Sequence, residues 1–242
     1  MKKVAIGWLR YCLAASLVFA YNDWILGYCL NPQMSANRAS ISELSAITQP
    51  YHAVFQTLDI IAGILTLVCV VYVWRFTEHI TPHKRWLLLG LFLFIGLDSI
   101  VDASLPIACA PSVDPSCSFS LLGTQSIITR AHLIESNIAG TVIAIAPIAW
   151  WWLHRSGKHR HIAIASIWLI AVELAVGISA VIVRFTHNAN YGGIQRIYQG
   201  VLGIWVGVLV YTAITVHLET KTDHHLKEKK TSSKSGNINA AS

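Results

Sequence analysis

Residues 90–117 read GLFLFIGLDSIVDASLPIACAPSVDPSC. The first part of this stretch is apolar enough to form a membrane helix, yet it carries Asp98 and Asp102 four residues apart. An ionisable side chain at the centre of an inserted helix costs about 2.5–3.5 kcal/mol, and such residues usually mark functional positions. The stretch therefore predicts a membrane-spanning helix whose second half carries a polar face.

The composition of the whole chain extends this prediction. Of its 242 residues, 54% are hydrophobic and only 12% are charged, whereas a soluble domain carries about 25% charged residues. Apolar stretches of about 20 residues match the hydrocarbon core of a bilayer. Six such stretches occur, at residues 8–30, 51–74, 86–108, 126–153, 162–183 and 197–218. We therefore expect an all-α, polytopic bundle of six transmembrane helices within residues 1–218.

The basic residues predict the orientation of these spans. Fourteen of the 18 Lys and Arg residues lie at the N-terminus, in the second and fourth links between spans, and in the tail. The other four are Arg38, Arg130, Arg184 and Arg196. Because cytoplasmic loops are enriched in Lys and Arg, both termini are expected in the cytoplasm. The net charge of +6 then reflects membrane topology and requires no nucleic-acid partner.

The two ends of the chain carry separate expectations. A basic start and small residues before Ala20 allow residues 1–20 to be a cleaved signal peptide. Against this alternative, the apolar run continues to residue 30 and only there reaches a spanning length. Residues 219–242 are polar and charged, which predicts a disordered cytoplasmic tail near the anionic lipid surface.

Two cysteines predict a covalent link on the outer side. Cys109 and Cys117 flank the turn-rich sequence APSVDPS after the third span. Disulfides form in oxidising compartments outside the cytoplasm. A Cys109–Cys117 disulfide is therefore expected in this loop.

Half of the 12 acidic residues fall within the predicted spans, which is a high share for costly groups. They are Asp23, Asp59, Asp98, Asp102, Glu135 and Glu173. All except Glu173 lie in the outer halves of their spans. Asp98 and Asp102 share one helix face, as do His132 and Glu135 at a spacing of three. We therefore expect an outward-facing polar chamber between spans two, three, four and six.

The expected site has two groups of residues. The principal residues are Asp98, Asp102, His132 and Glu135. The supporting residues, which would contribute to binding, are His52, Asp59, Arg130 and Arg196.

Three functions remain open for such a chamber. The arginines could pair with the acids in a purely structural network. Alternatively, His132 with Asp98 or Asp102 could hold zinc and an activated water, with Glu135 as general base, in a hydrolase for a lipid-like substrate. Acids and histidines in a bundle interior also serve proton-linked or small-solute binding and transport. The sequence contains no HExxH or GxSxG motif and no phosphate-binding, dinucleotide-binding or nucleic-acid-binding signature.

Four segments of the chain resemble the domain of unknown function 998 family, which comprises bacterial integral membrane proteins. The segments are ISELSAITQPYHAVFQTLDIIAG, LDSIVDASLPIACAPSVDPSC, RAHLIESNIAG and GGIQRIYQGVLGIW. The resemblance runs from about residue 26 to residue 218 and implies a helical bundle in the bacterial cytoplasmic membrane. It matches the family at polar and cysteine positions, namely Ser42, Glu43, Asp59, Asp98, Cys109, Cys117, His132 and Arg196.

The resemblance includes one departure and one looser likeness. The family often has a second histidine in the fourth span, in the region where this chain has Glu135. The layout is also loosely similar to membrane hydrolases of the alkaline ceramidase type, whose Ser, Asp and His residues hold zinc. The paired histidines on the last helix of those enzymes are missing here.

Overall fold

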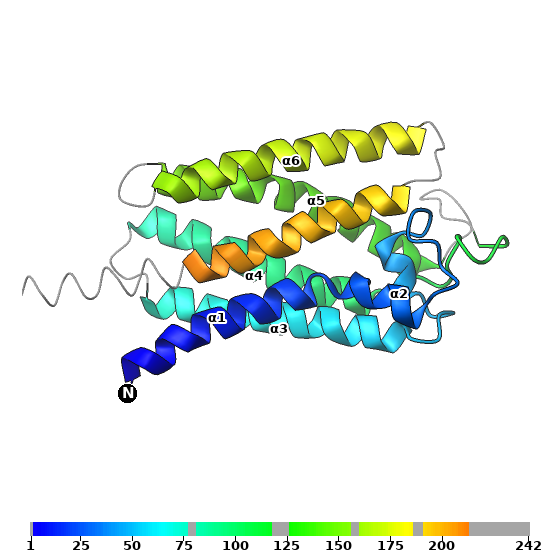
Figure 1. Ribbon diagram of the computed structural model, residues 1–242, viewed down its shortest axis with the longest axis horizontal. Helices are drawn as coiled ribbons and strands as arrows, with labels where there is room; N and C mark the ends of the chain where they lie inside the picture. The colour runs from blue at the N-terminus through cyan, green and yellow to red at the C-terminus, as the bar shows by residue number, and fades with distance from the viewer. Residues whose placement is uncertain (1, 77–80, 118–125, 156–159, 186–190, 213–242) are drawn as a thin grey trace, which may run out of the picture.

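The computed structural model describes residues 2–76, 81–117, 126–155, 160–185 and 191–212. Within these ranges the chain forms helices and no β-strand, so the all-α prediction is confirmed. The long helices are α1 (Lys2–Ala20), α3 (His52–Phe76), α4 (Pro82–Ser104), α5 (Ile127–His154), α6 (Arg160–Phe185) and Tyr191–Thr212, which is drawn in orange without a label. They run along the long axis of the molecule as one bundle (Figure 1).

The described helices are able to span a membrane. Four of them are long and apolar enough, namely α3, α4, α5 and Tyr191–Thr212. The bent pair Tyr11–Ala20 and Asp23–Leu30 raises the number to five if it forms one span, and α6 contains the shorter apolar stretch Ile164–Ser179. Large apolar side chains such as Trp168 and Val71 are exposed, as lipid-facing residues of a bundle would be.

The first predicted span, residues 8–30, is not one straight helix. The chain bends by 54° between Tyr11–Ala20 and Asp23–Leu30. After the bend, it forms two short helices, η1 (Asp23–Leu26) and α2 (Gly27–Leu30). At the break the Asn22 side chain donates to the carbonyl oxygen of Val18 at 2.8 Å. Asn22 lies so close to Gly203 that a Cβ atom there would collide with it. The bend thus depends on a glycine in a distant helix.

Local signals explain the other helix ends. Helix α4 begins with Pro82, which suits a first helical position, and ends at Ser104, shortly before Pro106. The predicted span 86–108 therefore continues four residues too far. Helix α5 begins after Ser126, whose hydroxyl accepts from the backbone N–H of Thr129 at 3.2 Å. The last helix begins at Tyr191, six residues before the predicted start at 197.

Helices α3 and α4 approach each other at a pair of glycines. A Cβ atom on Gly63 would lie 2.6 Å from the carbonyl oxygen of Gly96, and one on Gly96 would lie 3.0 Å from the carbonyl oxygen of Gly63. Small residues at such crossings let membrane helices pack backbone to backbone. The α3–α4 contact therefore depends on the absence of side chains at both positions.

Two linkers cover the end of the bundle where α2 lies (Figure 1). One is residues 31–50, which contains η2 (Ile41–Ser45), and the other is residues 105–117. The backbone N–H of Ile47 donates to the carbonyl oxygen of Ile107 at 3.0 Å. Apolar side chains of both linkers, such as Leu44 and Ile107, share one buried cluster.

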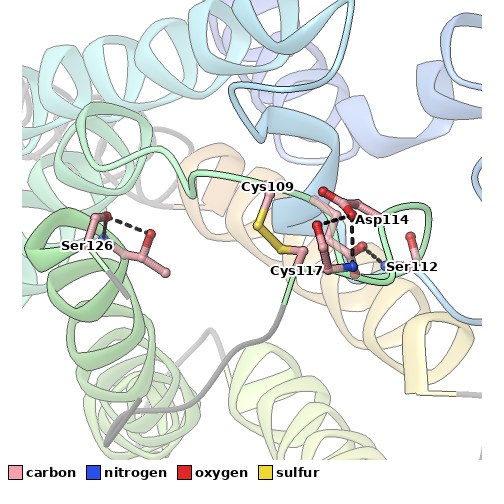
Figure 2. Close-up of a disulfide and its surroundings, with 8 residues drawn as sticks. Cys109, Ser112, Asp114, Cys117 and Ser126 are labelled. Carbon is pink, nitrogen blue, oxygen red and sulfur yellow. Dashed lines mark hydrogen bonds between the residues drawn. A yellow bond between two sulfur atoms is a disulfide. The ribbon is translucent and has the colours of Figure 1, made fainter. Parts of the chain in front are cut away.

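The expected disulfide is present in the second linker. Cys109 and Cys117 are bonded, and Asp114 lies on the loop between them (Figure 2). Ser116 donates its hydroxyl and its backbone N–H to Asp114 Oδ1, at 2.6 and 2.9 Å, which holds the pKa of this carboxyl below its usual range. At a pH above the ordinary pKa of Asp, these bonds stabilise the loop. They are lost as the pH falls through the lowered pKa of Asp114.

Replacing Gly63 by valine should destabilise the protein by about 1–3 kcal/mol, because the added side chain would force α3 away from α4. The matched control is Gly90→Val on the same helix pair, since a Cβ atom on Gly90 meets nothing within 4 Å. Thermal unfolding of the two variants in detergent measures the difference. Equal melting temperatures would contradict the proposed role of the glycine contact.

Candidate functional site

A cavity of about 230 Å³ lies at the end of the bundle that the two linkers cover. Its walls come from α3, α4, α5 and Tyr191–Thr212, and from η1 and η2. Its polar lining consists of Tyr21, Asp23, Ser42, Ser45, Asp59, Asp98, Ser99, Asp102, His132, Glu135, Ser136, Gln195, Tyr198 and Gln199.

The charge of this lining is one-sided. Five lining residues are acids, namely Asp23, Asp59, Asp98, Asp102 and Glu135. One is a histidine, and among the described residues that line the cavity none is Lys or Arg. The five acids are also five of the six that the sequence places within spans. The side chain of the sixth, Glu173, lies outside the part that the structure describes.

The closest group in the cavity joins α4 and α5. Asp102 Oδ1 lies 3.2 Å from His132 Nδ1, and one ligand atom each of Asp102, His132 and Glu135 lie within 4.8 Å of one another. His132 is only 3% exposed. Its Nδ1 has no hydrogen-bond partner, since the contact with Asp102 lacks hydrogen-bond geometry. Buried polar atoms are rarely left without partners, so this group has unused ligand capacity.

The remaining acids continue the group across the cavity. The carboxyl group of Glu135 interacts with those of Asp98 and Asp102, and Asp59 is close enough to Asp23 and Asp102 for mutual repulsion. Asp23 is 6% exposed, and its Oδ2 has no hydrogen-bond partner. The acids therefore form one connected set of repelling carboxyl groups.

A hydroxyl network joins three segments beside the acids. The hydroxyl of Tyr21 lies 2.9 Å from that of Ser99 and 3.1 Å from that of Thr66. The Thr66 and Ser99 hydroxyls also bond to carbonyl oxygens one turn earlier in their own helices. This network ties the bend after α1 to α3 and α4, close in the chain to the cavity residues Asp23 and Asp98.

Three of the supporting residues lie away from the cavity. His52 is the first residue of α3, and its Nδ1 lies 2.8 Å from the carbonyl oxygen of Gln49. Arg130 is exposed and does not line the cavity. Arg196 is 5% exposed and donates through Nη1 to the carbonyl oxygens of Ala36 and Ala39, both at 2.6 Å, and of Gly192 at 3.1 Å. Arg196 thus anchors the first linker and does not reach into the acidic cavity.

Glu43 holds the two linkers together, a role that the family resemblance, which marks only its position, does not indicate. Its Oε1 accepts from the backbone N–H and the hydroxyl of Ser40, at 2.7 and 3.1 Å. Its Oε2 accepts from the backbone N–H of Ser112 at 2.8 Å, on the disulfide loop of Figure 2. The spacing of Ser40 and Glu43 is that of a capping box, which is the sequence signal for this helix start. The link to Ser112 has no sequence signal.

Asp23, Tyr21, Gln195 and Gln199 are cavity residues outside the expected site. Gln195 Oε1 accepts from the backbone N–H of Ile41 at 2.9 Å, which ties η2 to the last helix. The sequence marks Asp23 as an acid within a predicted span. No local pattern marks Tyr21, Gln195 or Gln199, because the bend in the first span and the packing of the last helix bring them to the cavity.

A family model with the description "Protein of unknown function (DUF998)" matches residues 13–212. The chain therefore belongs to this family, as the resemblance of its segments indicates. No curated protein and no solved structure matches the chain.

Replacing Glu43 by alanine should destabilise the protein by about 3 kcal/mol, because hydrogen bonds to a charged group are lost and the backbone N–H groups of Ser40 and Ser112 lose their partner. Thermal unfolding in detergent measures the loss. Asp114→Ala is the control, since this carboxyl accepts its hydrogen bonds from Ser116 within its own loop. A Glu43→Ala protein as stable as the Asp114→Ala protein would contradict the linker role.

Proposed function

We propose that this member of the DUF998 family crosses the bacterial cytoplasmic membrane six times, with both termini in the cytoplasm and the cavity facing outward. The four apolar helices and the bent pair would make five spans, and helix α6, with 26 residues, would be the sixth. The disulfide supports this orientation, because Cys109–Cys117 lies at the cavity end and disulfides persist in oxidising compartments.

The opposite end of the bundle supports the same orientation. There the Arg85 guanidinium stacks 4.0 Å from the Trp74 ring and donates to the Trp74 carbonyl oxygen at 2.7 Å. Lys84 lies 5.7 Å from the Trp152 ring in the same region. Basic residues with tryptophans are typical of a cytoplasmic membrane interface.

In the cavity, we propose a divalent metal site formed by Asp102, His132 and Glu135. The observation that carries this proposal is the buried His132 Nδ1, which has no hydrogen-bond partner and lies 3.2 Å from Asp102 Oδ1. One ligand atom each of His132, Asp102 and Glu135 lies within 4.8 Å of the other two. Zinc takes imidazole nitrogen and carboxylate oxygen as ligands. A neutral imidazole and two carboxylates would also balance the charge of a divalent ion, which offsets the cost of burying them.

The proposed site suits metal-dependent hydrolysis better than a structural metal. Three protein ligands leave a fourth position open for water, as in catalytic zinc sites, and this position can open into a cavity of about 230 Å³. A bound zinc would supply Lewis acidity and an activated water. Because Glu135 belongs to the ligand group here, the neighbouring Asp98 is the better proton carrier. Asp98 would take a proton from the water while the water oxygen attacks the carbonyl carbon of an ester or amide. Asp98 would then give this proton to the leaving group.

Proton-linked binding or transport is the second candidate function. It is favoured by the five carboxylates that face one another without a lining Lys or Arg among the described residues. In the absence of a metal, adjacent carboxyl groups must share protons, because like charges at short range cannot all persist. The two candidates therefore differ in whether a metal or protons neutralise Asp102 and Glu135.

Metal analysis of the detergent-purified, untagged full chain should find about one zinc per protein after zinc loading and desalting. His132→Ala and Asp102→Asn should each weaken zinc affinity by more than about 100-fold, since loss of even an outer-shell partner costs about 10–100-fold. Asp114→Asn is the matched control and should retain the metal. A folded wild-type protein that holds no zinc or other divalent ion would overturn the hydrolase and favour the proton-linked site.

Thiol counting tests the proposed orientation. In membranes of a bacterial host, denaturing alkylation should modify three cysteines before reduction, namely Cys12, Cys29 and Cys69, and five after reduction. A mass shift on a gel gives the count. Five reactive thiols without reduction would place the cavity end on the reducing, cytoplasmic side and contradict the proposal.

A further inference from the structure

The cavity contains more negative charge than the proposed metal would neutralise. After Asp102 and Glu135 are assigned to the metal, three acids still line the cavity, namely Asp23, Asp59 and Asp98. Asp23 is the most enclosed, at 6% exposed, and its Oδ2 has no hydrogen-bond partner. Since the described lining includes no Lys or Arg, this oxygen has no cationic group of the cavity wall to neutralise it.

Aromatic residues line the same cavity as these acids. Tyr21 adjoins Asp23 in the chain, and Phe55 precedes Asp59 by one helical turn on α3. Both rings line the cavity, as does that of Tyr198 on the last helix. Carboxylates combined with aromatic faces recognise organic ammonium groups through ion pairing and cation–π attraction. A phosphate or carboxylate ligand would instead be repelled by Asp23, Asp59 and Asp98.

The volume of the cavity limits the size of the ligand. At about 30 Å³ per water, a cavity of about 230 Å³ holds about seven waters, far more than a bare monovalent ion needs. It is smaller than the range of about 300–1,000 Å³ that is usual for drug-sized ligands. A small amine, or the ammonium head of a longer amphiphile, is the size that fits.

We propose that the Asp23 and Asp59 side of the cavity binds the ammonium group of an organic amine. The idea that this amine is a substrate rests on the proposed function, since the amine would be the part of the hydrolase substrate held beside the metal. Asp23, Asp59 and Asp102 line the same cavity, so an amine held at Asp23 and Asp59 would share that cavity with the Asp102 group. As a binding site, the proposal stands without the metal, because neither Asp23 nor Asp59 belongs to the ligand set.

A headgroup series on the wild-type protein tests this site without any variant. Octylammonium, octanol and octanoate have the same chain and differ in charge, and calorimetry in an uncharged maltoside detergent measures their binding to the full chain. Octylammonium should bind at least tenfold more tightly than either of the others. Equal binding of the three compounds would overturn the proposal. If ethylammonium binds as tightly as octylammonium, the ligand is a small amine; if only octylammonium binds, it is an amphiphile.

Three isosteric variants identify the residues. Asp23→Asn and Asp59→Asn should each weaken octylammonium binding by tenfold or more and retain the zinc stoichiometry, which also reports that they fold. Asp114→Asn, the same change outside the cavity, should leave binding unaltered. Tight octylammonium binding in both cavity variants would overturn the assignment.

The same titrations with zinc-loaded and chelator-treated protein separate the two proposals. Amine binding in a protein that holds no zinc would support the amine site and remove the hydrolase. Zinc binding without any preference for the amine would remove the amine site and leave the metal site in place.

Discussion

Five carboxyl groups and one imidazole are enclosed at one end of an apolar helix bundle, where repulsion between like charges is screened far less than in water. Neighbouring carboxylates in such a place require cations or protons between them. The helices themselves bring the groups together, because Asp98 and Asp102 come from α4 and His132 and Glu135 from α5. The function of the cavity therefore depends on which cation or how many protons neutralise these five carboxyl groups.

Two other buried charged residues at the same end of the protein bond to the backbone of the linkers. Glu43 accepts from the backbone N–H groups of Ser40 and Ser112, and Arg196 donates to three carbonyl oxygens. Both fasten linkers over the cavity through bonds that need no ligand. Asp23, His132 and Glu135, by contrast, each keep a buried polar atom without a hydrogen-bond partner. Partners for these atoms have to come from a ligand, an ion or water.

The covering linkers depend on contacts between distant parts of the chain. Glu43 in the first linker bonds to Ser112 in the disulfide loop, and Gln195 of the last helix bonds to η2. Gly192 lies so close to the carbonyl oxygen of Ala39 that a side chain could not fit there. The cavity is therefore covered by a framework that the disulfide, one glutamate and one arginine stabilise together.

The sequence by itself determined the helical class, the membrane-spanning length of most helices, the disulfide and the family, because each depends on local composition or on a quoted motif. It also placed Asp98, Asp102, His132 and Glu135 near one depth, since residue count along a helix sets position along its axis. Only the tertiary structure decided which polar residues face one cavity. The rotation of each helix about its axis and the bend at Tyr21 and Asn22 arise from packing against distant residues such as Gly203. For the same reason, Asp23 lines the cavity, whereas Arg196 bonds to the carbonyl oxygens of the first linker.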